Sequence, residues 1–171
     1  IICANKLLSL DKLDEAVRER ANYTLAKSLL ANQNTGQAIE EFKRLTKAKN
    51  PEYAAEAQYT LAELNFMAGK IDEAEKIIHQ INANPSSEYY LAKAFILWAD
   101  IFKSKGNTLQ AKQTLQSIID NYEGDEELIE TARQKLISLT MQQEKTQQEK
   151  QEKRQEQQEA VDEIIIVDEP R

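Results

Sequence analysis

The sequence predicts an all-α fold in which pairs of helices repeat along the chain as a solenoid. The tetrapeptide Tyr-Thr-Leu-Ala occurs at 23–26 and again at 59–62, and a further shift of 37 residues aligns Leu61 with Trp98 and Gly69 with Gly106. Each period contains two stretches whose apolar residues recur every three or four positions, as on one face of a helix. With four Gly and three Pro among 171 residues, the many tight turns of a strand-rich fold are excluded.

The period divides the first 140 residues into a half unit, three full units and a capping helix. The first helices of the units carry Ala21, Leu25, Ala26 and Leu29, then Ala57, Leu61, Ala62 and Leu64, then Ala94, Phe95, Trp98, Ala99 and Phe102. The second helices carry Ala38, Ile39, Phe42 and Leu45, then Ile71, Ala74, Ile78 and Ile81, then Ala111, Leu115, Ile118 and Ile119. The capping helix carries Leu128, Ala132, Leu136 and Leu139. These patterns predict a half unit at 1–14, units at about 15–51, 52–87 and 88–124, and a capping helix at 125–140.

Glycine and proline mark the breaks between these helices. Gly69 and the sequence 106–108 lie between the two helices of their units, where glycine ends a helix in the left-handed conformation and Thr108 can cap the next helix. Gln33 stands at the corresponding position of the first unit. Pro51 and Pro85 separate one unit from the next, because proline cannot continue a helix.

A set of residues at fixed positions carries a family resemblance. They are Tyr23, Leu25, Ala26, Ala38, Phe42 and Pro51, then Tyr59, Leu61, Ala62, Gly69, Ala74 and Pro85, then Ala99, Gly106, Ala111 and Tyr122. With this pattern the chain resembles the tetratricopeptide repeat family over about residues 1–139, although its units are two or three residues longer. The resemblance implies a right-handed α-solenoid, stabilised because each unit buries its apolar faces against its neighbours.

The longer units and two short stretches point to one branch of that family. The stretches 106–111 and 117–122 are similar to repeats of bacterial cell-envelope proteins. The resemblance implies the C-terminal array of a large envelope protein, located in the periplasm, and the cytoplasm is the alternative location. The chain begins with Ile-Ile-Cys, which is typical of the middle of a helix, so we expect it to be part of a longer protein.

The resemblance also implies a function, which is to bind a protein or peptide partner in the concave groove lined by the first helix of each unit. The implied lining residues are Arg20, Tyr23, Lys27 and Leu30, then Glu56, Tyr59, Glu63 and Phe66, then Lys93, Ile96, Asp100 and Lys103. Tyr23 and Tyr59 stand one unit apart, and they either contact an extended peptide or pack between adjacent helices. A regulatory array attached to an enzyme domain is another reading. One branch of the family grips a peptide carboxylate with Lys and Asn side chains at set lining positions. Here those positions hold Tyr23, Lys27, Thr60, Lys93 and Leu97, of which two are basic and none is Asn, so we expect no such carboxylate clamp.

The C-terminal part of the chain has a different composition. Residues 141–160 are mostly Gln, Glu, Lys and Arg, which predicts either a solvated helix or disorder. Residues 161–171 place the apolar run Ile164, Ile165, Ile166 and Val167 between acidic pairs. This run is either a disordered end or a tail motif that docks into its own chain or into a neighbouring copy, which would make the protein a homo-oligomer.

Several function classes have no support in the composition. The net charge of −7 argues against nucleic-acid binding, and no apolar run is long enough to insert into a membrane. The single His79 belongs to an exposed helix face, and Cys3, which aligns with the small residue Ala38, is expected to be a buried thiol. We therefore expect no catalytic residues, no metal site and no cofactor, and no enzymatic activity.

Overall fold

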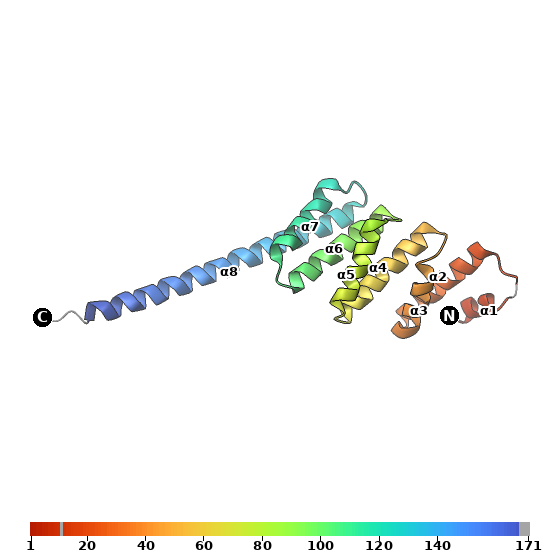
Figure 1. Ribbon diagram of the computed structural model, residues 1–171, viewed down its shortest axis with the longest axis horizontal. Coiled ribbons are helices and arrows are strands. Elements are labelled where there is room, and N and C mark those ends of the chain that lie inside the picture. The colour runs from red at the N-terminus through yellow and green to blue at the C-terminus, as the bar shows by residue number, and fades with distance from the viewer. Residues whose placement is uncertain (11, 168–171) are drawn as a thin grey trace.

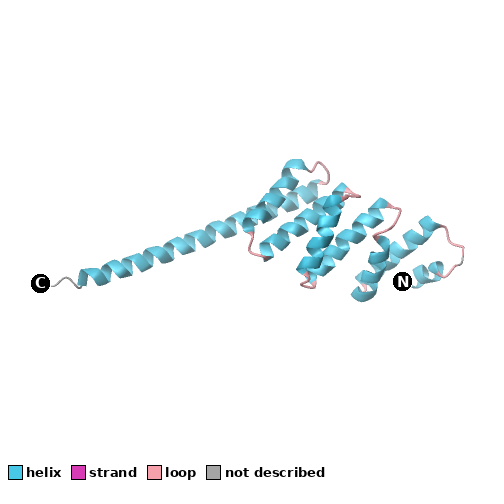
Figure 2. Cartoon of the chain, viewed as in Figure 1, coloured by secondary structure: helices cyan, strands magenta, loops and turns pink. Residues whose placement is uncertain are grey.

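The computed structural model describes residues 1–10 and 12–167, with side chains up to residue 157. The described residues form helices and no strand (Figures 1 and 2). The helices are α1 (Ile2–Leu8), α2 (Glu15–Ala31), α3 (Thr35–Leu45), α4 (Pro51–Met67), α5 (Ile71–Ala83), α6 (Glu88–Ser104), α7 (Thr108–Asn121) and α8 (Glu126–Val167). The prediction of an all-α fold is confirmed.

The helices stack in chain order as antiparallel pairs, α2 with α3, α4 with α5 and α6 with α7 (Figure 1). Each second helix also packs against the first helix of the next pair, and α7 packs against α8 in the same way. The buried residues form three apolar clusters, centred on Phe42, Ile78 and Leu115. Because each cluster draws residues from successive pairs, stacking of neighbours stabilises the solenoid, as in other repeat proteins.

The helix ends follow the local sequence. Asn50 caps α4, accepting hydrogen bonds from the backbone N–H groups of Glu52 and Tyr53, and Pro51 is the first helical residue. At the start of α7 the cap is Asn107, not Thr108 as the sequence predicted, and Thr108 is the first residue of the helix.

Three equivalent turns join the two helices of each pair. Gly69 and Gly106 have φ angles of 74° and 75°, so glycine takes the left-handed conformation there as expected. Gln33, at the same position of the first unit, has a φ of 62°. This non-glycine residue therefore holds a conformation that is unfavourable for its side chain.

Small residues allow the paired helices to approach closely. Ala38, Ala74 and Ala111 are completely buried at equivalent positions of α3, α5 and α7. In α1 the buried small residue is Ala4, whereas Cys3 is exposed. The prediction of a buried thiol was therefore wrong by one residue, because Ala4 and not Cys3 faces α2 and its neighbours.

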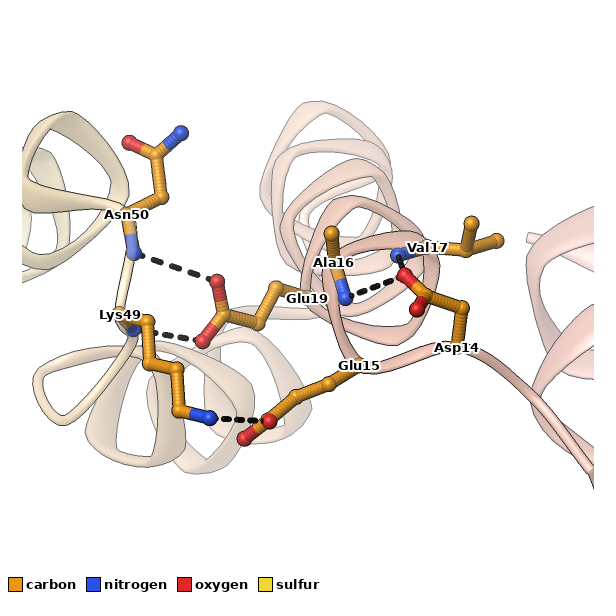
Figure 3. A network of polar contacts seen from close by, with 7 residues as sticks. All are labelled: Asp14, Glu15, Ala16, Val17, Glu19, Lys49 and Asn50. Carbon is orange, nitrogen blue, oxygen red and sulfur yellow. Dashed lines mark hydrogen bonds and ion pairs between the residues drawn. The ribbon is translucent and has the colours of Figure 1, made fainter.

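A polar clamp connects the start of α2 to the loop before α4 (Figure 3). The two carboxylate oxygens of Glu19 accept hydrogen bonds from the backbone N–H groups of Lys49, at 2.6 Å, and Asn50, at 3.2 Å. The side chain of Lys49 forms an ion pair with Glu15, one turn earlier on α2. Asp14 caps α2 itself by accepting from Ala16 and Val17. The clamp fixes the loop from which α4 begins.

Helix α8 has two parts with different environments. Leu128, Ala132 and Leu139 are buried against α6 and α7, so the first part covers the end of the solenoid. The helix continues without a break and leaves the body, and residues 141–157 are exposed (Figure 1). The sequence left a solvated helix or disorder open for this extension, and in the structure it is a helix. The backbone of Ile164–Val167 belongs to the same helix, while the side chains of this tail motif and residues 168–171 lie outside the described residues.

Candidate partner-binding face

The predicted lining residues lie on α2, α4 and α6, and α8 extends the same series of helices. Most of them are exposed or half-buried, which leaves their side chains accessible. Tyr59 is the exception, with only 9% of its surface exposed. The structure brings nine of the twelve residues together in three groups, one at each junction between successive first helices.

The first group joins α2 to α4 through the carboxylate of Glu56. The hydroxyl of Tyr23 donates a hydrogen bond to this carboxylate at 2.7 Å, and the ammonium of Lys27 forms an ion pair with its other oxygen. The ring of Tyr23 stacks on Tyr53, with 4.4 Å between ring centroids. Within this group the polar atoms satisfy one another, so the group acts mainly as a link between units.

The electrostatics of this group follow from its contacts. Burial raises the pKa of the Glu56 carboxyl, but hydrogen bonds from Lys27, Tyr23 and Tyr90 together outweigh burial, and the pKa lies below its ordinary value. Burial and the neighbouring carboxylate raise the pKa values of the Tyr23 and Tyr90 hydroxyls. At neutral pH the group therefore holds an ionised carboxylate between neutral phenols.

The second group surrounds Tyr59 on α4. Its hydroxyl donates to Glu63, one turn further along the helix, at 2.8 Å, and its ring belongs to the second apolar cluster. Burial is the main cause of its raised pKa, followed by the hydrogen bond to Glu63. The sequence left Tyr59 either to contact a peptide or to pack between helices. The structure supports packing between helices, so most of its ring is not accessible to a peptide.

Lys93 on α6 is the accessible cation of the second group. Its ammonium lies over the ring of Tyr59, 4.4 Å from the centroid, and 5.6 Å from the centroids of Tyr89 and Tyr90. No ion pair in the described part of the chain involves Lys93. A cation over aromatic rings is held in place without being neutralised.

A cavity of about 290 Å³ opens beside this lysine, between α4, α6 and the start of α8. Its residues are Tyr59, Tyr89, Lys93, Ile96, Asp125, Glu127, Leu128 and Thr131. Apolar groups form part of its lining, while one ammonium and two carboxylates supply charge. This combination accepts a segment that has both apolar and charged side chains.

The third group joins α6 to α8. The ammonium of Lys135 donates hydrogen bonds to both carboxylate oxygens of Asp100, at 2.7 and 2.8 Å. A smaller cavity of about 240 Å³ lies beside this pair and includes Lys103 and Leu139.

Three of the predicted lining residues are not part of these polar groups, namely Arg20, Leu30 and Phe66. Leu30 packs against the first apolar cluster and Phe66 against the second.

The sequence reasoning missed several residues of this face, above all Tyr53, Tyr89, Tyr90 and Lys135. A signal was present for two of them, because Tyr53 and Tyr90 stand one period apart and begin equivalent helices. Lys135 was missed because α8 was treated as a cap and not as a further lining helix.

In the described residues no group of three or more His, Cys, Asp or Glu side chains is placed to hold a metal ion. His79 is exposed as predicted, and its ring meets the edge of Trp98 at 4.8 Å between centroids. Within the same residues, no helix has the length and apolar character that crossing a membrane requires.

The stacked helix pairs and their shared lining face define a helical-repeat protein of the kind that binds other proteins. Profiles of the family described as Tetratricopeptide repeat match residues 29–96 and 88–124. The chain belongs to the tetratricopeptide repeat family, whose repeats generally mediate protein–protein interactions and are typically non-catalytic scaffolds. A comparison with curated proteins finds no match to this chain.

Proposed function

We propose that this chain is a scaffold that binds a protein or peptide partner on the face formed by α2, α4, α6 and α8, as part of a larger bacterial envelope protein. The observation that carries the binding site is the environment of Lys93. Lys93 is half-buried and borders a cavity with an apolar part, and its ammonium lies over the ring of Tyr59.

The rest of the face supports the choice of this cavity. At the α2–α4 junction, Tyr23 and Lys27 already bond to Glu56, and at the α6–α8 junction Lys135 already bonds to Asp100. A partner would have to break these bonds in order to use them. At Lys93 a carboxylate of the partner gains a charge-assisted bond without displacing one from the chain. Apolar side chains of the partner can cover the half-buried Ile96 beside it.

Selection from a random peptide library tests this site on the full chain. Peptides selected by the wild type and measured by calorimetry should bind at least tenfold more weakly to Lys93→Ala and to Ile96→Asp. The matched control is Lys76→Ala, which removes an exposed lysine from α5 outside the lining face. If Lys93→Ala and Ile96→Asp bind as tightly as the wild type while both remain folded, the binding site lies elsewhere.

The envelope location is proposed from the similarity of the stretches 106–111 and 117–122 to envelope repeats, and it has its own test. The parent protein can be located by fractionating cells and probing the periplasmic and cytosolic fractions with an antibody to this chain. Recovery in the periplasmic fraction supports the proposal, while recovery in the cytosol supports the alternative location.

A further inference from the structure

In the exposed part of α8, basic and acidic side chains lie on different faces of the helix. Lys153 and Arg154 come three and four residues after Lys150, so the three side chains share one face of the helix. Glu149, Glu152 and Glu156 follow a neighbouring face. We refer to Lys150, Lys153 and Arg154 as the basic stripe. All three side chains are exposed, and none takes part in an ion pair among the side chains that the structure describes.

The basic stripe continues into a groove at the point where α8 leaves the body. A cavity of about 440 Å³ lies between the end of α6, the start of α7 and α8. Its residues are Lys103, Thr108, Leu139, Gln142, Gln143, Thr146, Gln147 and Lys150. It shares Lys103 and Leu139 with the smaller cavity beside Asp100 and Lys135. Across both cavities three lysines face one carboxylate, so this groove is positive on a chain whose net charge is −7.

The same chain contains a segment with the opposite charge. Residues 161–169 read Val-Asp-Glu-Ile-Ile-Ile-Val-Asp-Glu, with acidic and aliphatic residues and no basic residue. The acidic residues of this segment complement the positive charge of the groove, whose lining also includes the exposed side chains of Gln142, Gln143 and Gln147. A segment of this kind binds through charge steering at its acidic residues and through burial of its aliphatic ones.

The geometry of α8 keeps the described part of this segment, residues 161–167, away from the groove of its own chain. These residues lie on the same continuous helix as Leu139 and Lys150 of the groove, and this helix points away from the solenoid (Figure 1). At a rise of about 1.5 Å per residue, Leu139 and Ile164 are separated by roughly 38 Å along the axis. The occupant that the sequence supplies must therefore come from another molecule of the same protein.

We propose that the acidic and aliphatic segment 161–169 of a second copy docks on the basic stripe and the adjoining groove, so that two α8 helices pair in an antiparallel manner. In such a pair each chain contributes one segment and one groove, which gives a closed, two-fold symmetric dimer. Surface ion pairs between the two copies weaken as salt screens them, so the dimer dissociates at high ionic strength.

Light scattering coupled to size exclusion tests the dimer on the full chain over a range of concentration and salt. We expect the measured mass to exceed the chain mass of 19.6 kDa at low salt and to return to this value at high salt. The variant Lys150→Glu/Lys153→Glu/Arg154→Glu should raise the dissociation constant at least tenfold. Its matched control is Lys47→Glu/Lys76→Glu/Lys145→Glu, which makes the same change in net charge away from the stripe and should dimerise like the wild type.

Two further variants keep the test decisive. Because glutamates at all three positions can melt this part of α8, Lys150→Gln/Lys153→Gln/Arg154→Gln removes the charge with a good helix former. The complementary variant Asp162→Lys/Glu163→Lys should be monomeric alone and should form a mixed dimer with the triple glutamate variant. A wild type that stays monomeric at every concentration overturns the proposal, and so does a dimer that survives the triple substitutions. Binding of the monomeric wild type to anionic vesicles or to an oligonucleotide would assign the stripe to another partner.

Discussion

The hydroxyl of Tyr23 on α2 donates a hydrogen bond to the carboxylate of Glu56 on α4 at 2.7 Å. The bond crosses from one repeat unit to the next, 33 residues apart in the chain. Because Lys27 bonds to the same carboxylate, Glu56 accepts from two residues of the preceding unit. One acidic side chain thus links the first two units on the face where the partner is proposed to bind.

A double-mutant cycle measures this link. Tyr23→Phe removes only the hydroxyl, and Glu56→Gln removes the charge while keeping the size of the side chain. We expect the two changes to be coupled by about 1 kcal/mol in the free energy of unfolding, the usual size for a partly exposed hydrogen bond to a charged group. Denaturation by urea provides the four values, and additive effects would show that the bond contributes nothing to stability.

The ionisation of Glu56 should make the stability of the fold depend on pH in the acidic range. Its pKa in the folded state lies below the ordinary value of 4.5, so ionised Glu56 stabilises the fold above that pH. The stabilisation is lost as the pH falls through the pKa of the folded state. The difference in stability between wild type and Glu56→Gln should therefore shrink below about pH 4.5. A difference that is constant down to pH 3 would contradict this assignment.

Alkaline pH should unfold the chain through three tyrosines, the buried Tyr59 and the half-buried Tyr23 and Tyr90. Burial is the first cause of the raised pKa values of Tyr23, Tyr59 and Tyr90, whose ordinary value is 10.0. Since the folded state holds these protons more tightly, stability is complete below pH 10 and decreases as the pH rises above it. In a titration followed by ultraviolet absorbance, these phenols should ionise together with the loss of helical circular dichroism. Tyr90→Phe should shift the unfolding midpoint to higher pH, while ionisation of all six tyrosines before any loss of helix would refute the prediction.

The sequence left two readings of Tyr59 open, contact with a peptide or packing between helices. Only 9% of this side chain is exposed and its ring packs in the second apolar cluster. Tyr59→Ala should therefore lower the free energy of unfolding by about 3 kcal/mol, as for other large-to-small changes in a core. Tyr59→Phe is the control, because it keeps the ring and loses only the bond to Glu63. A melting temperature unchanged in Tyr59→Ala would place the ring outside the core.

The periodicity of the sequence was sufficient to predict the architecture, because the same apolar faces must be buried in every unit. It placed the completely buried residues Ala38, Ala74 and Ala111 correctly. It placed a buried residue one position too early where neighbouring residues have similar size, because Ala4 is buried and Cys3 is not. It also did not predict which of two adjacent polar residues, Asn107 or Thr108, would cap a helix.

The candidate site was less predictable than the fold for a physical reason. Lining positions follow from the repeat, but whether a side chain there is free depends on its neighbours in the next unit. Glu56 and Asp100 were assigned to the groove, and each carboxylate is already bonded across units, to Tyr23 and Lys135. For residues 141–157 the composition left two states open. Gln, Glu, Lys and Arg favour a helix, yet no apolar stripe shows what holds it in place.

Gln33 offers a stabilising substitution. It has a φ of 62° at the turn where the other two units have Gly69 and Gly106. Gln33→Gly removes the steric cost of the left-handed conformation, and part of the gain is offset by the greater freedom of glycine in the unfolded chain. We expect a net stabilisation of about 0.5–1 kcal/mol in urea denaturation. The reverse change, Gly69→Ala, should destabilise through the backbone alone, because nothing lies within 4 Å of the added Cβ.

The clamp at the start of α4 gives a prediction that distinguishes two acidic residues of one helix. Glu19 accepts from the backbone N–H groups of both Lys49 and Asn50, whereas Glu15 makes only an exposed ion pair with the Lys49 side chain. Glu19→Gln leaves one of the two N–H groups facing an amide donor, so it should destabilise the fold by about 1 kcal/mol. Hydrogen exchange should then become faster at the amides of Lys49 and Asn50. Glu15→Gln, the matched control, should change neither measurement, because exposed ion pairs contribute little. Equal effects of the two substitutions would mean that the loop is held by general electrostatic attraction and not by the hydrogen bonds of Glu19.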